Sequence, residues 1–194
     1  MTGGATPIPV GVVRPRAVCV FCASSERIDP AHAVLAAAVG TEIASRGWSL
    51  VSGGGSVGMM GAVARAVRAG GGRTLGVIPQ ALVDLEVADH DAHELLVTDD
   101  MRQRKGLMDS RADAFLTLPG GIGTLEELLE IWVARSLGMH DKPLVVLDPH
   151  GVLAPLRDHV EALVVSGFVR PAAAAHVTWA STVAEAFDAL APPG

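Results

Sequence analysis

The chain of 194 residues lacks the features that mark membrane-spanning and secreted proteins. No apolar run reaches the roughly 20 residues that a transmembrane helix needs. The first residues contain several prolines and glycines and no long apolar core, which argues against a secretory signal. We therefore expect a cytoplasmic protein with no membrane partner.

Positive charge is also scarce. The formal net charge is −6 at pH 7, and nucleic-acid binding relies on a broad basic surface, so we expect no nucleic-acid partner. Lysine occurs only at Lys105 and Lys142. Pyridoxal phosphate is normally held as a Schiff base on a lysine, so the chain offers few positions for that cofactor.

Cysteine is limited to Cys19 and Cys22, within an apolar segment of strand length. Residues three apart on a strand point to opposite faces, and no second cysteine pair is present to complete a zinc site. We expect both to be core residues. The acidic and histidine-containing segment 80–93 matches no familiar metal site either, and we interpret it as a solvated loop. The sequence thus predicts no metal site.

What the chain does contain is an alternation of apolar strand segments and helical patterns. Hydrophobic residues make up 49% of it, enough for a substantial core. Alternating strands and helices imply an α/β fold with a mainly parallel sheet and helices on both faces. We expect residues 1–15 to form a flexible leader and 16–194 a single domain. The strands are expected at residues 17–22, 48–51, 73–78, 94–98, 112–118, 143–147 and 177–180.

Two glycine-rich turns follow expected strands and precede expected helices, at residues 52–61 and 118–127. Such a turn presents free backbone N–H groups and the positive end of a helix dipole to a ligand, which suits an anion. Ser24 and Ser25 follow the first strand. Ligands of open parallel sheets bind at the carboxyl ends of the strands, so we expect the three turns to meet at one site.

Charged residues accompany these turns. Glu126 and Glu127 are expected in the first turn of the helix after the second glycine turn, beside the anion site. The pattern Thr124-x-x-Glu127 also fits a capping box, in which both side chains only bond to the helix end. Arg102, Arg104 and Lys105 lie early in another expected helix, against the dipole preference, which indicates either an anionic partner or a solvated face.

Three segments together resemble the signatures of the Lonely Guy (LOG) family: Ser52-Gly-Gly-Gly-x-x-Gly-x-Met-Gly61, Met101-x-x-Arg104-Lys105 and Pro119-Gly-Gly-x-Gly-Thr-x-x-Glu127. The resemblance extends from about residue 17 to 180. It implies a doubly wound, Rossmann-like fold, a homodimer and no cofactor. It also implies hydrolysis of the N-glycosidic bond of adenine-type, N6-modified nucleoside 5′-monophosphates, as in cytokinin riboside 5′-monophosphate phosphoribohydrolases.

Carried over residue by residue, the resemblance makes Arg104 and Glu127 the catalytic pair. The substrate-binding residues that it implies are Ser25, Gly54, Gly55, Glu86, Lys105, Gly120, Gly121, Gly123, Thr124 and Glu126. Glu86 would face the base, and the glycines and Thr124 would hold the ribose and phosphate.

The chain departs from the family pattern at Ala23, where glycine is common, and at Arg102, where histidine is common. These positions bear on fine substrate preference more than on the reaction. Sequences with this Pro-Gly-Gly motif have also been labelled lysine decarboxylases, but we expect no such activity because no lysine is suitably placed. The alternative that we retain is a nucleotide-binding sensor or carrier without turnover.

Overall fold

The computed structural model describes residues 14–83 and 87–192, and within them one parallel sheet organises the chain. Its seven strands have the order β4-β3-β2-β1-β5-β6-β7, and all neighbours run parallel. The strands are β1 (Ala17–Phe21), β2 (Ser49–Ser52), β3 (Thr74–Pro79), β4 (Glu94–Thr98), β5 (Ala114–Thr117), β6 (Leu144–Leu147) and β7 (Val177–Ala180). The predicted parallel α/β fold is confirmed.

Helices connect the strands, and several begin where the sequence predicts. They are α1 (Pro30–Ser45), α2 (Gly58–Ala69), α3 (Gln80–Val83), α4 (Met101–Arg111), α5 (Ile122–Ser136), α6 (Ala154–Val165), α7 (Pro171–Ala174) and α8 (Val183–Leu190). Asp29 caps α1 by accepting a 2.8 Å hydrogen bond from the Ala31 N–H, and Asp100 caps α4 in the same way. The four-residue helices α3 and α7 were not predicted, because one turn carries no periodic pattern.

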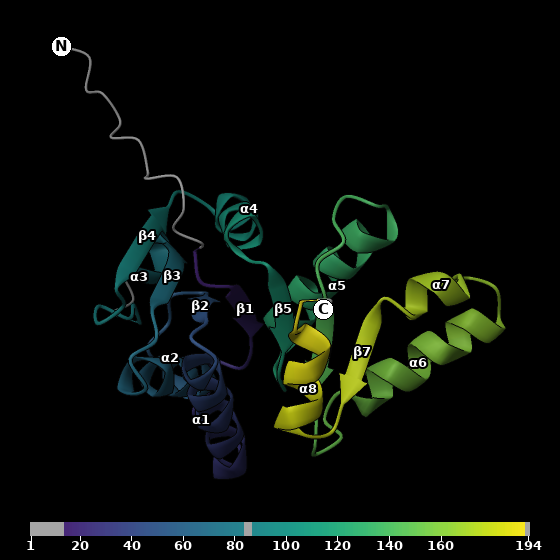
Figure 1. Ribbon diagram of the computed structural model, residues 1–194. Helices are drawn as coiled ribbons and strands as arrows, with labels where there is room; N and C mark the ends of the chain where they lie inside the picture. The colour runs from purple at the N-terminus through teal and green to yellow at the C-terminus, as the bar shows by residue number, and fades with distance from the viewer. Residues whose placement is uncertain (1–13, 84–86, 193–194) are drawn as a thin grey trace.

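Two hydrophobic clusters cover the two faces of the sheet. Helices α1, α2 and α8 pack on one face, and α4 and α5 pack on the other (Figure 1). Cys22 belongs to the first cluster and Cys19 to the second, and both are free and buried. The prediction that the two cysteines are core residues on opposite faces is confirmed.

The strand order creates one switch point. The chain builds outward from β1 to β4 and then returns to β5, which lies on the other side of β1. The connections leaving β1 and β5 therefore diverge to opposite faces, and a crevice opens beyond their carboxyl ends. This is the place where open α/β sheets bind ligands.

The segment 80–93 was predicted to be a solvated loop, and its described part bears this out only in part, because Gln80, Ala81, His90, Asp91 and His93 are exposed but other residues are not. Its first residues form α3, and Ala88 and Asp89 are only 5% and 6% exposed. The charge of Asp89 is compatible with burial because Arg68 of α2 lies 2.6 Å away and neutralises it. Glu86, the predicted base contact, lies outside the described residues.

The expected leader falls largely outside the description as well, since only Arg14 and Pro15 of it are described. Arg14 donates two hydrogen bonds, of 2.8 and 2.6 Å, to the carboxylate of Asp113. Across residues 14–83 and 87–192, none of the helices has the length and apolar character needed to cross a membrane.

Candidate active site

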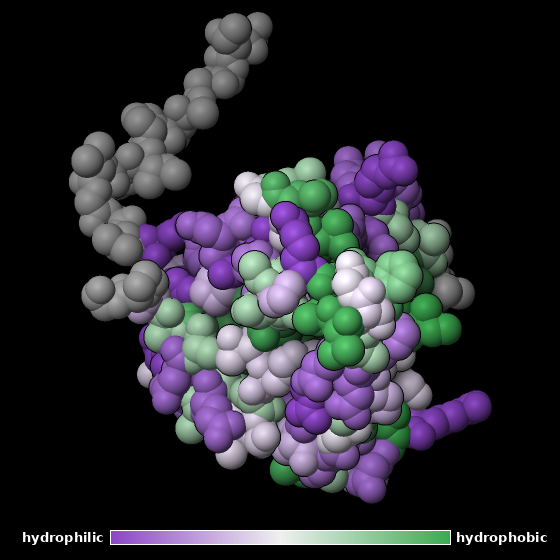
Figure 2. All heavy atoms as spheres, turned by 90° about the vertical axis from the view of Figure 1, so that its right-hand side faces the viewer, coloured by the Kyte–Doolittle hydropathy of each residue, from purple (hydrophilic) through white to green (hydrophobic). Residues whose placement is uncertain are grey.

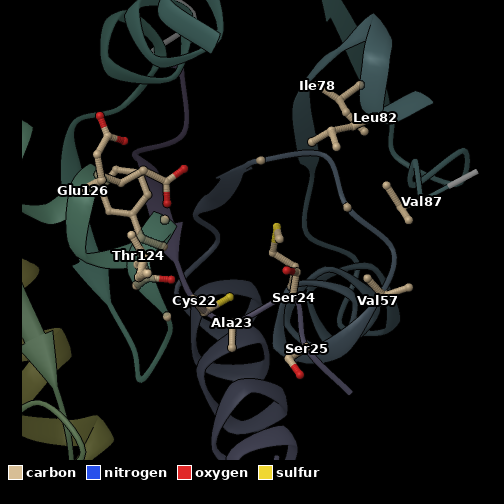
Figure 3. A pocket seen from close by; sticks show the side chains of 18 of the residues that line it. Cys22, Ala23, Ser24, Ser25, Val57, Ile78, Leu82, Val87, Thr124 and Glu126 are labelled. Atoms are coloured by element: carbon tan, nitrogen blue, oxygen red, sulfur yellow. The ribbon is translucent and has the colours of Figure 1, made fainter. Parts of the chain in front are cut away.

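A cavity of about 590 Å³ lies at the switch point, beyond the carboxyl ends of β1 and β5. The turn after β1 supplies Ser24 and Ser25, the turn after β2 supplies Gly55, and α5 supplies Thr124 and Glu127. Figure 3 shows the serines below the cavity and Thr124 and Glu126 on one side of it. The predicted convergence of the three turns on one site is confirmed.

Two helices begin at this cavity, and the described residues place no side-chain cap on either. Val57 precedes α2 and Gly121 precedes α5, and both line the cavity. The first N–H groups of a helix have no intrahelical acceptor, so both ends carry a partial positive charge. At α2 the Met59 N–H already donates to the Ala23 carbonyl at 3.0 Å. Gly58 permits this arrangement: its φ is +56°, and a Cβ there would lie 2.7 Å from the Ser24 backbone.

The charged residues of the cavity come from two different helices. Arg104 of α4 is buried and 7% exposed, and its Nη1 lies 3.2 Å from Oε1 of Glu127 on α5. Its Nε donates a 3.1 Å hydrogen bond to the Val77 carbonyl of β3. The guanidinium is therefore held in one orientation, with a carboxylate on one side and the sheet on the other.

Burial changes the acidity of this carboxylate. The Glu127 side chain is only 11% exposed, and the loss of hydration raises its pKa above the ordinary value for glutamic acid. The positive charge of Arg104 opposes the increase, and the negative charge of Glu126 adds to it. A carboxylate with a raised pKa is a stronger base than a solvated one, which suits it to accept a proton.

A second ion-pair group lies beside the first. Lys105, next to Arg104, contacts Glu126, next to Glu127, and also lies 2.6 Å from Glu130. These carboxylates raise the pKa of the Lys105 ammonium. Arg104 and Lys105, two of the three cations that oppose the α4 dipole, are thus paired with carboxylates of α5, which the sequence interpretation did not anticipate.

The structure corrects one prediction about the start of α5 and excludes one alternative. The helix begins at Ile122, so Glu126 and Glu127 lie in its second turn and not in its first. The capping box over Thr124 and Glu127 does not form, because Gly121 occupies the N-cap position and Glu127 turns to Arg104. The chain does form a capping box, at Thr182 and Glu185 of α8.

The structure brings most of the predicted site residues to the cavity wall, which is lined by Ser25, Gly55, Arg104, Gly121, Gly123, Thr124, Glu126 and Glu127. Gly54 and Gly120 belong to the same turns but do not line the cavity. Lys105 lies instead at a second cavity of about 350 Å³ between α4 and α5, which Glu127 also borders. The roles of all these residues in binding and catalysis stay predictions.

The sequence interpretation did not include the apolar wall, which consists of Val57, Met60, Ile78, Leu82 and Val87. Ile78 stands near the carboxyl end of β3, so the rule that located the three turns could have found it. Leu82 and Val87 lie in a segment without periodicity, and nothing in its pattern indicates a cavity wall.

Neither lysine is placed to hold a Schiff base. Lys105 is bound by carboxylates, and Lys142 lies 2.6 Å from Asp109. A lysine nucleophile needs a lowered pKa, and the pKa of Lys105 is raised. Over the described ranges 14–83 and 87–192, no three His, Cys, Asp or Glu side chains gather closely enough to hold a metal ion.

The fold and the cavity together define a Rossmann-like α/β protein with a cavity at its switch point, where two helices begin. Comparison with known families gives a narrower result. The family model described as "Possible lysine decarboxylase" matches residues 60–190. The chain belongs to this family, which is also known as the LOG family.

Curated relatives carry a different name from that description. A Mycobacterium tuberculosis protein named cytokinin riboside 5′-monophosphate phosphoribohydrolase is 52% identical over 178 residues, covering 90% of this chain and 93% of the relative. An Arabidopsis thaliana relative, named cytokinin riboside 5′-monophosphate phosphoribohydrolase LOG3, is 41% identical over 170 residues, covering 88% and 79%.

Solved structures support the fold. The molybdenum cofactor binding protein of Rippkaea orientalis has a TM-score of 0.70 and 20% identity, covering 91% of this chain and 96% of that one. The Moco carrier protein of Chlamydomonas reinhardtii has a TM-score of 0.69 and 24% identity, covering 92% and 96%. At this identity the likeness concerns architecture alone.

Proposed function

We propose that this protein hydrolyses the N-glycosidic bond of adenine-type nucleoside 5′-monophosphates, including N6-modified cytokinin nucleotides. The products are the free base and ribose 5-phosphate. The observation that carries the proposal is the buried Arg104–Glu127 pair in the wall of a cavity that two uncapped helices face. The names of the curated relatives support the same reaction.

Glu127 is the proposed base. Cleavage of a glycosidic bond passes through an oxocarbenium-like sugar, which water attacks on the face opposite the leaving base. The carboxylate of Glu127 orients that water, takes its proton and offsets the positive charge that develops on the sugar. Its raised pKa strengthens it as a base, and its burial strengthens its electrostatic effect.

Arg104 and the helix ends are the proposed anchors. The phosphate accepts hydrogen bonds from the backbone N–H groups of Gly121 to Thr124, where the α5 dipole favours negative charge. The Arg104 guanidinium keeps Glu127 oriented through its 3.2 Å contact and offsets charge on the phosphate or the leaving base. The ribose thereby lies between the phosphate cradle and Glu127.

The decisive experiment incubates the purified protein with AMP and with isopentenyladenosine monophosphate and separates free base by chromatography. Replacing Glu127 by Gln retains size and hydrogen bonding but removes the base, so turnover should fall at least about 100-fold. Far-UV circular dichroism before the assay confirms that the variant is folded. Wild-type turnover in E127Q would contradict the assignment.

The alternative, a sensor or carrier that binds a nucleotide without cleaving it, makes a different prediction for the same assay. It expects tight binding of AMP and no released base from the wild-type protein. A site that only binds a phosphate gains nothing from a nearby carboxylate, because the two negative charges repel each other. The position of Glu127 therefore favours hydrolysis.

We further propose that the protein acts as a cytoplasmic homodimer. Leu129 and Val133 of α5 and its C-cap residue Leu137 are exposed at intervals of four residues, and the exposed Met139 follows them. Figure 2, which views the α6 and α7 side of Figure 1, shows apolar surface gathered on the upper part of that face. Exposed apolar rows of this kind mark protein interfaces, and a second copy would cover this one.

A further inference from the structure

The segment Val87–Asp89, which we call the strap, is paired with the glycine turn after β2. The Ser56 N–H donates to the Val87 carbonyl at 2.8 Å, and the Asp89 N–H donates to the Gly54 carbonyl at 2.8 Å. Gly55 and Ala88 form the antiparallel bridge between these two bonds. The strap and the glycine turn thus form one small two-stranded wall, and Gly55 and Val87 face the cavity from it.

Helix α2 anchors both strands of this wall. Nη1 of Arg68 donates a 2.6 Å hydrogen bond to Oδ2 of Asp89, and the side chains are 18% and 8% exposed. One turn earlier, Nη1 of Arg65 donates to the Ser56 carbonyl at 3.1 Å. Arg68 therefore holds the strap, and Arg65 holds the glycine turn. Neither arginine lines the cavity.

The wall is the apolar side of the cavity. Figure 3 shows Ile78, Leu82 and Val87 across the cavity from Thr124 and Glu126. The ribose and phosphate of a nucleotide would bond to the polar side of the cavity, which presents the N-terminus of α5 and Arg104. A purine base offers flat apolar faces, which are bound by stacking against apolar side chains. The strap is thus the part of the wall that a base would contact through Val87.

We infer that Arg68 and Asp89 are positioning residues for base recognition. Their ion pair keeps the strap against the glycine turn, so that Val87 packs on the base, and neither residue touches the substrate. This inference rests on the proposed function, because it assumes a nucleoside monophosphate in the cavity. Loss of one partner leaves a buried charge without compensation, which displaces the strap toward water.

The test compares AMP with ribose 5-phosphate, which has a hydroxyl in place of the base. All proteins used for calorimetry carry E127Q, so that AMP is bound without being cleaved. Calorimetry then measures the dissociation constants of AMP and of ribose 5-phosphate for this parent and for the parent with Arg68→Met or Asp89→Asn. The affinity for AMP should fall about tenfold in both variants, which corresponds to the loss of one well-packed contact. The affinity for ribose 5-phosphate should change by less than about twofold, since that ligand does not reach the strap.

Conservative and matched variants sharpen this test. Arg68→Lys keeps the charge and should recover most of the AMP affinity. Arg14→Met removes another 2.6 Å ion pair, with Asp113, at the amino ends of β1 and β5, and should change neither affinity. In turnover assays the two strap variants should raise KM for AMP while kcat changes by less than about threefold, because Arg104 and Glu127 belong to α4 and α5.

Other outcomes would overturn the inference. AMP affinity that is unchanged in folded D89N, or an equal loss for both ligands, would leave the ion pair a purely structural role. Should R68M fail to fold, D89N retains the size of the side chain and decides the question alone. An E127Q parent that is folded and binds neither ligand would contradict the proposed function itself, and this inference with it.

Discussion

Gly53 and Arg104 are in direct contact, and the glycine is what allows the guanidinium its position. A Cβ atom on Gly53 would lie 1.9 Å from Nη2 of Arg104, far inside any allowed distance. The same guanidinium is bonded to the Val77 carbonyl and to Glu127. The glycine turn after β2 therefore forms part of the cavity wall and also leaves the space that the Arg104 guanidinium occupies.

The first prediction concerns this contact. Gly53→Ala should lower kcat/KM at least about tenfold, because the guanidinium must leave its bonds to make room for the methyl group. The fold should persist, since the end of a flexible side chain can move. Steady-state assays with AMP and a thermal melt measure both effects. Gly106→Ala on α4, where a Cβ meets no atom within 4 Å, is the control and should keep full activity.

The second prediction concerns pH. Burial raises the pKa of Glu127, so protonation and loss of activity should begin at a higher pH than for a solvated glutamate. The profile of kcat/KM should therefore fall on the acid side with a midpoint above 4.5. Glu126→Gln removes a charge that raises this pKa, so it should move the midpoint to lower pH. A midpoint that moves upward would contradict the assignment of Glu127 as base.

The same shift has a consequence for stability. Between the ordinary pKa of glutamate and the raised pKa of Glu127, the folded state binds more protons than the unfolded state. Stability from this residue therefore decreases as pH rises through that window. Urea unfolding at several pH values should show a smaller pH dependence in E127Q than in the wild-type protein over this range.

The third prediction concerns the 5′-phosphate. Charge-assisted hydrogen bonds contribute about twice as much as neutral ones, and several would be lost with a neutral nucleoside. AMP should therefore be cleaved at least about 100-fold more efficiently than adenosine, in kcat/KM. The assay is repeated with EDTA, which should leave the rate unchanged because Arg104 and the helix ends supply the positive field. Equal rates for the two substrates, or inactivation by EDTA, would contradict the proposal that Arg104 and the helix ends bind the 5′-phosphate.

The fourth prediction concerns assembly. Val133 is 56% exposed within the apolar row of α5, and a charge there should prevent a second copy from packing. Val133→Asp should convert the dimer to a monomer in sedimentation equilibrium. Val34→Asp changes a valine on α1 that is 70% exposed, away from that row, and should remain dimeric. A monomeric wild-type protein would contradict the proposed homodimer.

The strand order and the place of the cavity follow from rules that a sequence can reveal. Alternating patterns predicted the parallel sheet, and three turns at strand ends predicted where a ligand would lie. The start of α5 was misread because Thr124 has the side chain of a cap, whereas Gly121 ends the preceding turn without one. A glycine N-cap carries no side-chain signal in the sequence.

The side-chain contacts between different helices and loops could not be predicted from the sequence pattern. Arg104 and Glu127 are 23 residues apart on separate helices, and only the family resemblance paired them. Arg68 and Asp89 are 21 residues apart, and the segment that contains Asp89 has no periodicity that would predict its burial. Such pairs depend on how α4 packs beside α5 and how the strap meets α2, which local propensity does not determine.

The two uncapped helix ends give this protein a positive rim on a body of net charge −6. A nucleotide dianion approaching from a distance meets the repulsion of the whole molecule. It meets the attraction of the helix ends only within about one Debye length, about 8 Å at physiological ionic strength. Stopped-flow association rates at increasing salt measure the balance. Added salt should raise the association rate and lower the affinity of the final complex. The salt concentration that gives the fastest association should therefore differ from the one that gives the tightest binding.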